Sequence, residues 1–558
     1  MKRRVLLLVA GAALLLLAWK LPTGWYDSLP RQPDTPPLPL RGVDLLRLTF
    51  LLESIVCVVL AFVAWRYKAL APSERLTLKA SEPTRDLSRS AAAASVVVIA
   101  FIAAFLRFYH LGSDLWLDEI TPVVDYGHMP WVQVMGSYLR TNNHLLNTLM
   151  IKLSIGVFGE SEWSIRLPAV LFGIAAVPAL YWLARTVLSR WASVGAAAMF
   201  AASYHHVFFS QNARGYSAYL FFSIVATALL LRALTDDKSW RWVLYVFAMV
   251  LGFTSLANMV FVFAAHVIVS IAAVNAVHRQ GGVANSLVRR LAVVFAAAGF
   301  LSFQVYAAPL PEMYVLVSKL YVREATGYAP FSREFFAEIA RGLSAGFGGI
   351  VPAIILAVAG IIGIVFFFRR NAYAASALAL PPVLTAMFLL VRGLSFSPRF
   401  FLLLIPLAIL TAMSTVQASD HAKRAGIIGV CLAAASLLTL PAYYRTPKQS
   451  YRAAIQYLDG VRTPDESIVV VYAASEGMKY YVPRVAKGEA GAYHYSRTLP
   501  SFDSLVAPPK KALVVTTFPR ILRADLPDLS ERITSEWRPQ RVFPATVGDG
   551  EITVWSRK

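Results

Sequence analysis

Long apolar runs separated by short polar and basic segments dominate the chain. A membrane-spanning helix needs about 20 mostly apolar residues, and by that measure the sequence predicts about thirteen spans. They cover approximately residues 5–21, 45–65, 91–110, 167–186, 192–209, 216–234, 240–256, 259–277, 291–308, 347–368, 372–391, 400–418 and 424–442. The first run resembles a signal peptide, but Trp19 and Lys20 stand where a small-residue cleavage site belongs. We therefore expect an uncleaved anchor.

Basic residues concentrate in alternate loops, which the positive-inside rule places on the cytoplasmic side. They crowd the loop after the second span and mark later loops: Arg66, Lys68, Arg75, Lys79, Arg85, Arg89, Arg289, Arg290, Arg369, Arg370, Lys423 and Arg424. With an odd number of spans, this orientation places the loops 111–166 and 309–346 and the segment 443–558 outside. We expect an inner (plasma) membrane protein with these segments on its extracytoplasmic side.

Two external segments have a helical pattern. In "PWVQVMGSYLR", residues 130–140, apolar side chains up to Tyr138 and Leu139 recur at helical spacing, which predicts a helix lying on the membrane surface. In "FSREFFAEIARG", residues 331–342, Ser332 can cap the helix and Gly342 can end it.

The last part of the chain changes in pattern. "SYRAAIQYLDG" is helical, whereas "SIVVVYAA", "KALVVTTF" and "EITVWS" are short runs rich in strand-forming residues. We therefore predict an all-α polytopic membrane protein with a small C-terminal α/β domain. The expected parts are an accessory hairpin and cytoplasmic loop at 1–90, a catalytic membrane core at 91–442, and an extracytoplasmic domain at 443–558.

Composition supports a membrane protein and excludes several other classes. Hydrophobic residues make up 57% of the chain and charged residues only 15%, against about 25% charged in soluble proteins. The net charge of +21 is explained by the basic loops, so we expect no nucleic-acid partner. Cys57 and Cys431 both lie in apolar runs, which excludes a disulfide framework or a cysteine-based metal site.

Two adjacent carboxylates, Asp118 and Glu119, follow the third apolar run in "LWLDEI". Neighbouring residues on a helix point about 100° apart, so this pair is not expected to share one task. One carboxylate can take part in chemistry while the other orients or binds. Their apolar flanks place them at the lipid boundary, where partial desolvation makes a carboxylate a stronger base.

Cations at the outer membrane edge are candidates for binding a phosphate group, because arginine donates two parallel hydrogen bonds to phosphate oxygens. We favour Arg399, then Arg214, over Arg392, with lipid-facing snorkelling as the alternative for each. His144 precedes an apolar run and is a further candidate for contacting the phosphate or the acceptor. No His, Asp and Glu cluster has metal-ligand spacing, so the sequence neither requires nor excludes a divalent cation.

Five sequence segments, taken in their order along the chain, resemble the segments of a known protein family. "DLWLDEITPV", "NNHLLNTLM", "SEWSIRLPAVLFG", "QNARGYSAYL" and "SPRFFLLLIPL" resemble the GT-C membrane glycosyltransferases, in the branch of protein O-mannosyltransferases and the lipid A aminoarabinose transferase. The resemblance covers roughly residues 91–460. It implies a sugar donor attached to a polyprenyl phosphate and an acidic catalytic base on the first external loop. By position that base is Asp118, with Glu119 as a supporting or metal-contacting neighbour.

The resulting hypothesis is transfer of a single sugar to a hydroxyl group of a lipid, glycan or protein acceptor, with inversion because one base and no placed nucleophile are found. A multi-span transporter is one alternative, although Glu53 is the only carboxylate within the predicted spans and ion-coupled transporters usually carry several. A polymerase or ligase of lipid-linked oligosaccharides is the other enzymatic alternative, and a non-enzymatic scaffold is a third.

Overall fold

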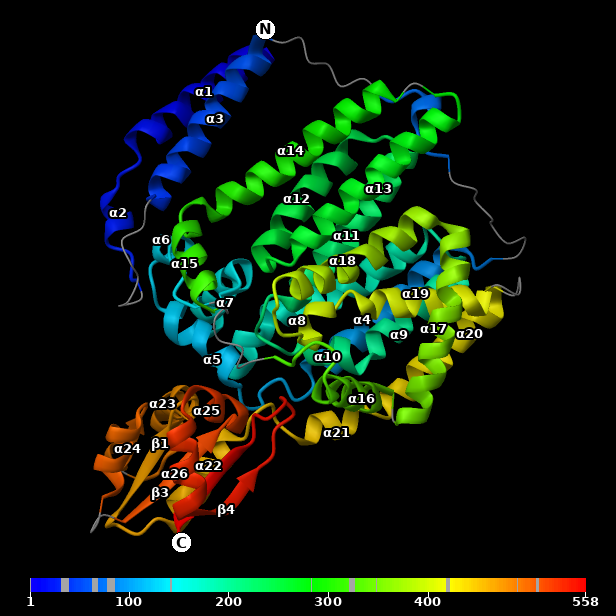
Figure 1. Cartoon of the computed structure of the whole chain (residues 1–558). Coiled ribbons are helices and arrows are strands. Elements are labelled where there is room, and N and C mark those ends of the chain that lie inside the picture. The colour runs from blue at the N-terminus through cyan, green and yellow to red at the C-terminus, as the bar shows by residue number, and fades with distance from the viewer. Residues whose placement is uncertain are drawn as a thin grey trace.

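The protein consists of a large helical bundle followed by a small domain built on a sheet. The computed structural model describes residues 2–31, 40–62, 69–77, 86–140, 143–282, 284–320, 327–347, 349–417, 422–488, 490–507 and 511–558. In Figure 1 the C-terminal domain, in orange and red, lies against one end of the bundle. The blue N-terminal helices lie along one edge of the bundle in the same view.

Eight helical segments among the described residues are long and apolar enough to cross a membrane. They are α3 (Gly42–Phe62), α4 (Arg89–Phe108), α8 (Glu162–Ala184), α11 (Tyr216–Thr235), α13 (Met259–Arg279), α14 (Asn285–Ala307), α18 (Ala372–Val391) and Ala422–Arg445, which contains α20 (Ala422–Leu437) and α21 (Leu440–Arg445). The protein is therefore a multi-pass membrane protein, as the apolar pattern predicts.

The other five predicted spans are also helical but are not among these eight. They correspond to α1 (Lys2–Lys20), α9 (Arg190–Ala202) with α10 (Tyr204–Ser210), α12 (Ser239–Ser255), α17 (Ile350–Arg370), and α19 (Leu404–Val416) with the short turn η3 (Pro398–Phe401). A break at Ser203 divides the fifth predicted span into two helices. The total of thirteen spans therefore stays a prediction.

Small residues let two helices of the bundle approach closely. A Cβ atom added to Gly429 of α20 would lie 2.6 Å from the Cα atom of Gly195 in α9. Close backbone approach through small residues is the usual way in which membrane helices gain packing energy. The alanine-rich sequence of α9 suits this position, because ten of its residues are buried.

The segment between α4 and α8 differs from the sequence prediction. It folds into α5 (Leu117–Pro122), a π-turn (Val123–Gly127), α6 (Trp131–Gly136) and the apolar helix α7 (Leu145–Phe158). The predicted surface helix at 130–140 thus ends at Gly136. Beyond it the backbone amides make long-range bonds, Tyr138 N to Glu312 Oε2 at 3.3 Å and Leu139 N to Tyr126 Oη at 2.6 Å. These bonds replace the helical ones.

The second external helix is longer than expected. Ser332 Oγ accepts a hydrogen bond from Phe335 N at 3.1 Å, so it caps α16 (Arg333–Phe347) as predicted. The helix does not end at Gly342 but continues for five more residues, and Gly342 faces His205 of α10. The preceding helix of this loop is α15 (Leu310–Leu320).

The N-terminal helices α1 and α3 pack against each other and are connected by a short helix α2 (Gly24–Asp27) and a Pro-rich segment. Most of that segment, residues 32–39, lies outside the described residues, as do Arg66, Lys68, Lys79 and Arg85. Glu53 accepts a hydrogen bond from Gln304 Nε2 at 3.0 Å. This carboxylate therefore ties α3 to α14.

The C-terminal domain contains a five-stranded mixed sheet with the strand order β2-β1-β3-β5-β4. Its elements are α22 (Tyr451–Val461), β1 (Glu466–Val471), α23 (Ala474–Val485), β2 (Tyr493–Ser496), α24 (Leu499–Val506), β3 (Lys511–Thr517), α25 (Pro519–Asp525), α26 (Pro527–Glu536), β4 (Trp537–Phe543) and β5 (Ile552–Arg557). β1 pairs in parallel with β2 and β3, while β5 is antiparallel to β3 and β4. The three predicted strands and the predicted helix are confirmed.

Candidate functional site

The candidate site is built around the short helix α5, which begins nine residues after the end of α4. The first amide of this helix is bound by the C-terminal domain, since Leu117 N donates to Gln449 Oε1 at 2.8 Å. Leu115 N donates to Tyr481 Oη at 2.7 Å, and α23 packs against α5. The position of Asp118 and Glu119 is therefore fixed by contacts from both the bundle and the C-terminal domain.

Asp118 lies between two arginines from distant parts of the chain. Its Oδ2 atom is 2.6 Å from Arg214 Nη1 and 3.6 Å from Arg399 Nη1. Arg214 precedes α11, and Arg399 lies in η3 before α19. Because Asp118 is 22% exposed and Arg399 29% exposed, this ion-pair cluster is accessible from outside the protein.

Arg214 is buried and belongs to a small polar network. Its Nη2 atom is 2.9 Å from His144 Nε2, and the other ring nitrogen of His144, Nδ1, is 3.1 Å from the Ser255 carbonyl oxygen. An arginine can only donate, so Nε2 must accept and Nδ1 must donate to the carbonyl. Burial and the adjacent Arg214 hold the pKa of His144 well below its usual value, which keeps this imidazole neutral.

The glycine of the "NARGY" motif, Gly215, lies where a larger residue would clash with this network. A Cβ atom on Gly215 would lie 2.0 Å from the Ser255 carbonyl oxygen and 2.6 Å from His144 Nδ1. Only glycine therefore fits between Arg214 and α11. Arg214 also retains a buried donor, Nε, without a hydrogen-bond partner among the described residues. This N–H group is therefore a donor that the protein groups described leave available.

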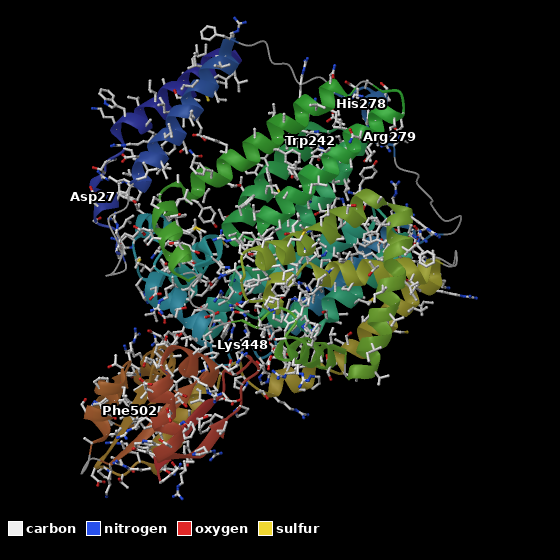
Figure 2. The ribbon with its side chains drawn as sticks, in the orientation of Figure 1. Asp27, Trp242, His278, Arg279, Lys448 and Phe502 are labelled. Carbon is white, nitrogen blue, oxygen red and sulfur yellow. The ribbon has the colours of Figure 1, made fainter. Side chains whose placement is uncertain are left out.

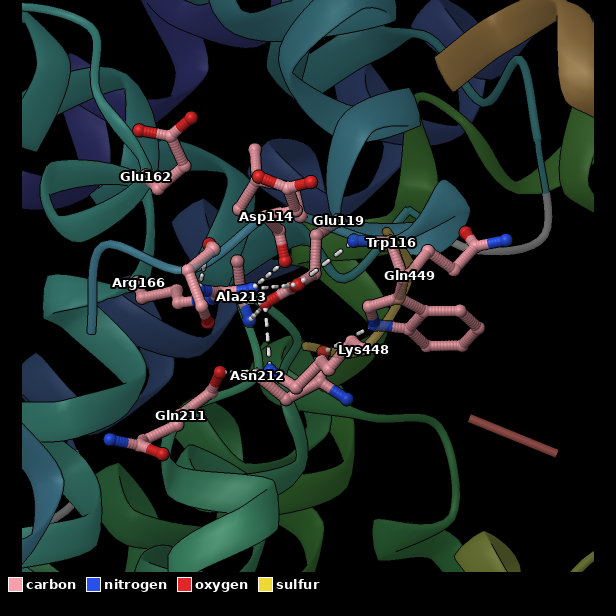
Figure 3. A network of polar contacts seen from close by, with 12 residues as sticks. Asp114, Trp116, Glu119, Glu162, Arg166, Gln211, Asn212, Ala213, Lys448 and Gln449 are labelled. Atoms are coloured by element: carbon pink, nitrogen blue, oxygen red, sulfur yellow. Dashed lines mark hydrogen bonds and ion pairs between the residues drawn. The ribbon is translucent and has the colours of Figure 1, made fainter. Parts of the chain in front are cut away.

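Glu119 lies in a closed network of polar contacts, separate from the partners of Asp118 (Figure 3). Arg166 of α8 binds it through two parallel bonds, Nε to Oε1 at 2.9 Å and Nη2 to Oε2 at 2.7 Å. Ala213 N donates to Oε1 at 2.8 Å, and Lys448 Nζ lies 3.2 Å from the same oxygen. Glu119 is fully buried. Burial alone would raise its pKa, but the cations outweigh that effect and lower the pKa to about 2.

Lys448 connects the two parts of the molecule, as its position in Figure 2 between the bundle and the C-terminal domain shows. Its ammonium group also donates to the Gln211 carbonyl oxygen. Burial, followed by repulsion from Arg166, lowers the pKa of Lys448 to about 7. Neither Arg166 nor Lys448 was predicted from the sequence. The available signal for Arg166 was its position directly before the predicted span 167–186.

The structure brings together four of the five candidate residues. Asp118, Arg214, Arg399 and His144 form one connected group, whereas Glu119 lies in the separate network with Arg166. The chemical roles of all five stay predictions. Among the described residues no group of three or more His, Cys, Asp and Glu side chains could hold a metal ion.

This geometry suits chemistry on a phosphate-bearing substrate. A partly exposed carboxylate can accept a proton, and two guanidinium groups within reach of it can bind phosphate oxygens. Arg214 lies two residues before α11, which is one of the eight candidate spans. The neighbouring carboxylate, Glu119, is bound by Arg166 through both of its oxygens.

Comparison with known proteins finds one matching family model and several solved structures with a similar fold. The model of the dolichyl-phosphate-mannose-protein mannosyltransferase family matches residues 145–306, a segment that includes Arg214 but not Asp118 or Arg399. A search of curated proteins finds no match.

Three solved structures illustrate the structural likenesses. ArnT from Cupriavidus metallidurans in the apo state has a TM-score of 0.49 and 12% identity, over 83% of this chain and 97% of ArnT. Archaeoglobus fulgidus oligosaccharyltransferase AglB, in complex with an inhibitory peptide and a dolichol-phosphate, has a TM-score of 0.45 and 13% identity. The match covers 79% of this chain and 72% of AglB. The Saccharomyces cerevisiae Pmt1-Pmt2 complex, bound to the sugar donor, has a TM-score of 0.34 and 16% identity. The match covers 44% of this chain and 38% of the matched chain.

The family match covers the first part of the membrane core, from α7 to α14, and includes two of the five quoted sequence segments in full. Over residues 145–306, the resemblance of this chain to the GT-C membrane glycosyltransferases is confirmed.

Proposed function

We propose that the protein is a glycosyltransferase that moves one sugar from a polyprenyl-phosphate donor to an acceptor hydroxyl group. The observation that carries this proposal is the placement of the Asp118 carboxylate within 2.6 Å of Arg214 and 3.6 Å of Arg399. This combination supplies a base and two phosphate-binding cations at one point. The family matched at residues 145–306 is named for a lipid-phosphate sugar donor, which supports the same substrate class.

In the proposed reaction Asp118 removes the proton from the acceptor hydroxyl as its oxygen attacks the anomeric carbon. A new bond forms between that oxygen and the carbon, while the bond from the carbon to the phosphate oxygen breaks. The electron pair leaves with polyprenyl phosphate. Displacement from the opposite face inverts the anomeric configuration, because the reaction proceeds in a single step without a carboxylate nucleophile.

Arg214 and Arg399 have the proposed role of holding the donor phosphate and stabilising the leaving group. Both guanidinium groups are paired with Asp118. A phosphate group that accepts from them loosens this pairing and frees the carboxylate to act as a base. The unpaired Nε atom of Arg214 adds a further donor. Neutral His144 orients Arg214 without adding a competing positive charge.

Glu119 is proposed to position α5 rather than to take part in the chemistry. Its closed contacts with Arg166 and Lys448 leave no free oxygen toward the Asp118 cluster. We further propose that the site faces the extracytoplasmic side and that the C-terminal domain, which is bound to α5, forms one wall of the acceptor path. The proposed acceptor is a hydroxyl group of a lipid, a glycan or a protein.

Purified protein reconstituted in lipid nanodiscs tests the proposed function. It is mixed with a panel of polyprenyl-phosphate sugars labelled in the sugar and with membrane extract as the acceptor source. The expected result is release of polyprenyl phosphate together with transfer of the label to an acceptor. A transporter would instead move the intact donor across a sealed vesicle. Transport without release of polyprenyl phosphate, for every donor of the panel, contradicts the proposal.

A further inference from the structure

The turn η3, which carries Arg399, is held by aromatic side chains on both sides of that arginine. Phe396, three residues before Arg399, is only 3% exposed. Its ring packs against Phe335 of α16, with centroids 5.4 Å apart, and against Phe401 of η3, at 5.7 Å. Arg399 itself lies 3.6 Å from Asp118, which is long for an ion pair. Because this contact is loose, the backbone of η3 has to set the position of the guanidinium group.

A β-bridge joins the start of this turn to the segment before α16. Tyr328 N donates to the Phe396 carbonyl oxygen at 2.9 Å, and Phe396 N donates to the Tyr328 carbonyl oxygen at 2.8 Å. The two segments approach closely, since a Cβ atom on Gly327 would lie 2.2 Å from Ser395 Oγ. A displacement of Tyr328 is therefore passed on to Phe396 and to the turn that follows it.

The C-terminal domain reaches this bridge through one arginine. Arg520, near the start of α25, places its guanidinium group over the Tyr328 ring, 4.7 Å from the ring centroid. Asp549 accepts two parallel hydrogen bonds from the same guanidinium, Nε to Oδ2 and Nη2 to Oδ1, each at 3.2 Å. Such a bidentate pair fixes the plane of the guanidinium group. Arg520 therefore presents a fixed face to the Tyr328 ring.

We propose that Arg520 is a positioning residue for Arg399, which acts through Tyr328 and its β-bridge to Phe396. This inference rests on the proposed function, in which Arg399 holds the donor phosphate. Arg520 supports donor binding without touching the donor, because its own contacts are with the protein. The C-terminal domain thereby acts on two elements of the candidate site, since Gln449 binds α5 and Arg520 acts on η3.

A double-mutant cycle in nanodiscs tests the proposal through the Kd of a fluorescent polyprenyl-phosphate sugar. Arg520→Ala should weaken binding by about two- to fivefold, the range for a cation–π contact at an exposed site. In an Arg399→Ala background the same change should have no further effect, because a residue that acts through another is not additive with it. Arg520→Lys keeps a cation over the ring and should stay within about twofold of the wild type.

The matched control is Arg532→Ala, on α26 of the same domain. Arg532 is 43% exposed, against 48% for Arg520, and it too is paired with carboxylates. Its partners, Asp503 and Glu536, belong to the C-terminal domain. The control should therefore leave the Kd of the donor unchanged.

A second measurement needs no donor. Backbone hydrogen exchange, followed by mass spectrometry, reports on the amide of Phe396 that bonds to Tyr328. Arg520→Ala should speed exchange in peptides that contain Phe396 by about two- to fivefold, because the bridge opens more often without the stacked arginine. Arg532→Ala should leave this exchange unchanged.

The same loss of affinity from Arg520→Ala in the wild type and in the Arg399→Ala background overturns the proposal, as does unchanged exchange at Phe396. An equal loss in Arg532→Ala also overturns it, because the effect would then concern the whole domain. If the wild type neither binds nor releases any donor, the proposed function fails, while the exchange result still decides whether Arg520 holds the bridge. Each variant is first checked for a single symmetric peak in size-exclusion chromatography, and Arg520→Gln replaces Arg520→Ala if the latter aggregates.

Discussion

Asp118 and Glu119 are adjacent in the chain, yet their environments differ in almost every physical respect. Asp118 is partly exposed and faces two arginines, of which Arg399 is also partly exposed and Arg214 is buried. Glu119 is fully buried and makes two parallel hydrogen bonds to a fully buried arginine, Arg166. A partly exposed carboxylate can exchange a proton with a substrate, whereas a fully buried carboxylate bound on both oxygens is poorly placed to do so. The comparison supports the proposal that Asp118 takes part in the chemistry and that Glu119 positions α5.

The difference follows from helix geometry. Residues i and i+1 of α5 point about 100° apart, so one side chain can face the open site while its neighbour faces the bundle interior. The Glu119 network joins α5 to α8 and to Lys448 at the start of the C-terminal domain. Fixing Glu119 thereby fixes the direction of Asp118. A buried ion pair serves this purpose well because breaking one partner is strongly destabilising.

The largest effect that separates the two carboxylates should appear in protein stability. Glu119→Gln removes the anion and leaves Arg166 and Lys448 buried without a counter-charge. We expect the free energy of unfolding in mixed micelles to fall by about 3–5 kcal/mol. Asp118→Asn, the matched comparison, should cost less than Glu119→Gln, because Asp118 is 22% exposed and only one of its two partners, Arg214, is buried. Similar losses for the two variants would contradict the division of roles.

A smaller effect should appear in donor binding. Arg214→Ala removes a buried charged donor and should weaken binding of a polyprenyl-phosphate sugar by about 1.5–3 kcal/mol, or roughly 10- to 150-fold in Kd. Arg399→Ala should weaken it less and slow turnover as well, because Arg399 is more exposed. Binding is measured by titration of the reconstituted protein with a fluorescent donor. Arg341→Ala, an exposed arginine on α16, is the control and should not change Kd.

The smallest effect concerns the pH dependence of stability. The pKa of Lys448 is lowered to about 7, against 10.5 in an unfolded chain. Between these values the unfolded state binds more protons than the folded state, so stability should rise with pH from about 7 to about 10.5. Lys448→Met removes this titration and should flatten that part of the curve. Melting temperatures measured from pH 6 to pH 10 check this, and an unchanged slope in the variant would contradict it.

The sequence predicts local features of this fold better than its long-range contacts. The apolar runs correspond to helices, Ser332 caps α16, and three strand-like runs form β1, β3 and β5. These features depend on local periodicity and capping. The prediction was wrong about the end of the helix at 130–140, because the amides after Gly136 bond to Tyr126 and Glu312 instead of continuing the helix.

The candidate site was also predicted in part. Asp118, Arg214, Arg399 and His144 were selected singly, and the structure brings them together. The network of Glu119 was missed because its partners, Arg166 and Lys448, lie 47 and 329 residues away in the sequence. No local pattern encodes which distant cation a buried carboxylate will contact. The position of Arg166 directly before the predicted span 167–186 is the signal that should have drawn attention to it.

The most direct measurement of the central claim is a single-turnover experiment on Asp118→Asn with the donor already bound. If Asp118 is the base, Kd for the donor should stay within about threefold of the wild-type value. The rate of polyprenyl phosphate release should fall by about 10²–10⁴-fold, the usual loss when a general base is removed. A release rate within a factor of ten of the wild type, at full donor occupancy, would contradict the assignment of Asp118 as the base.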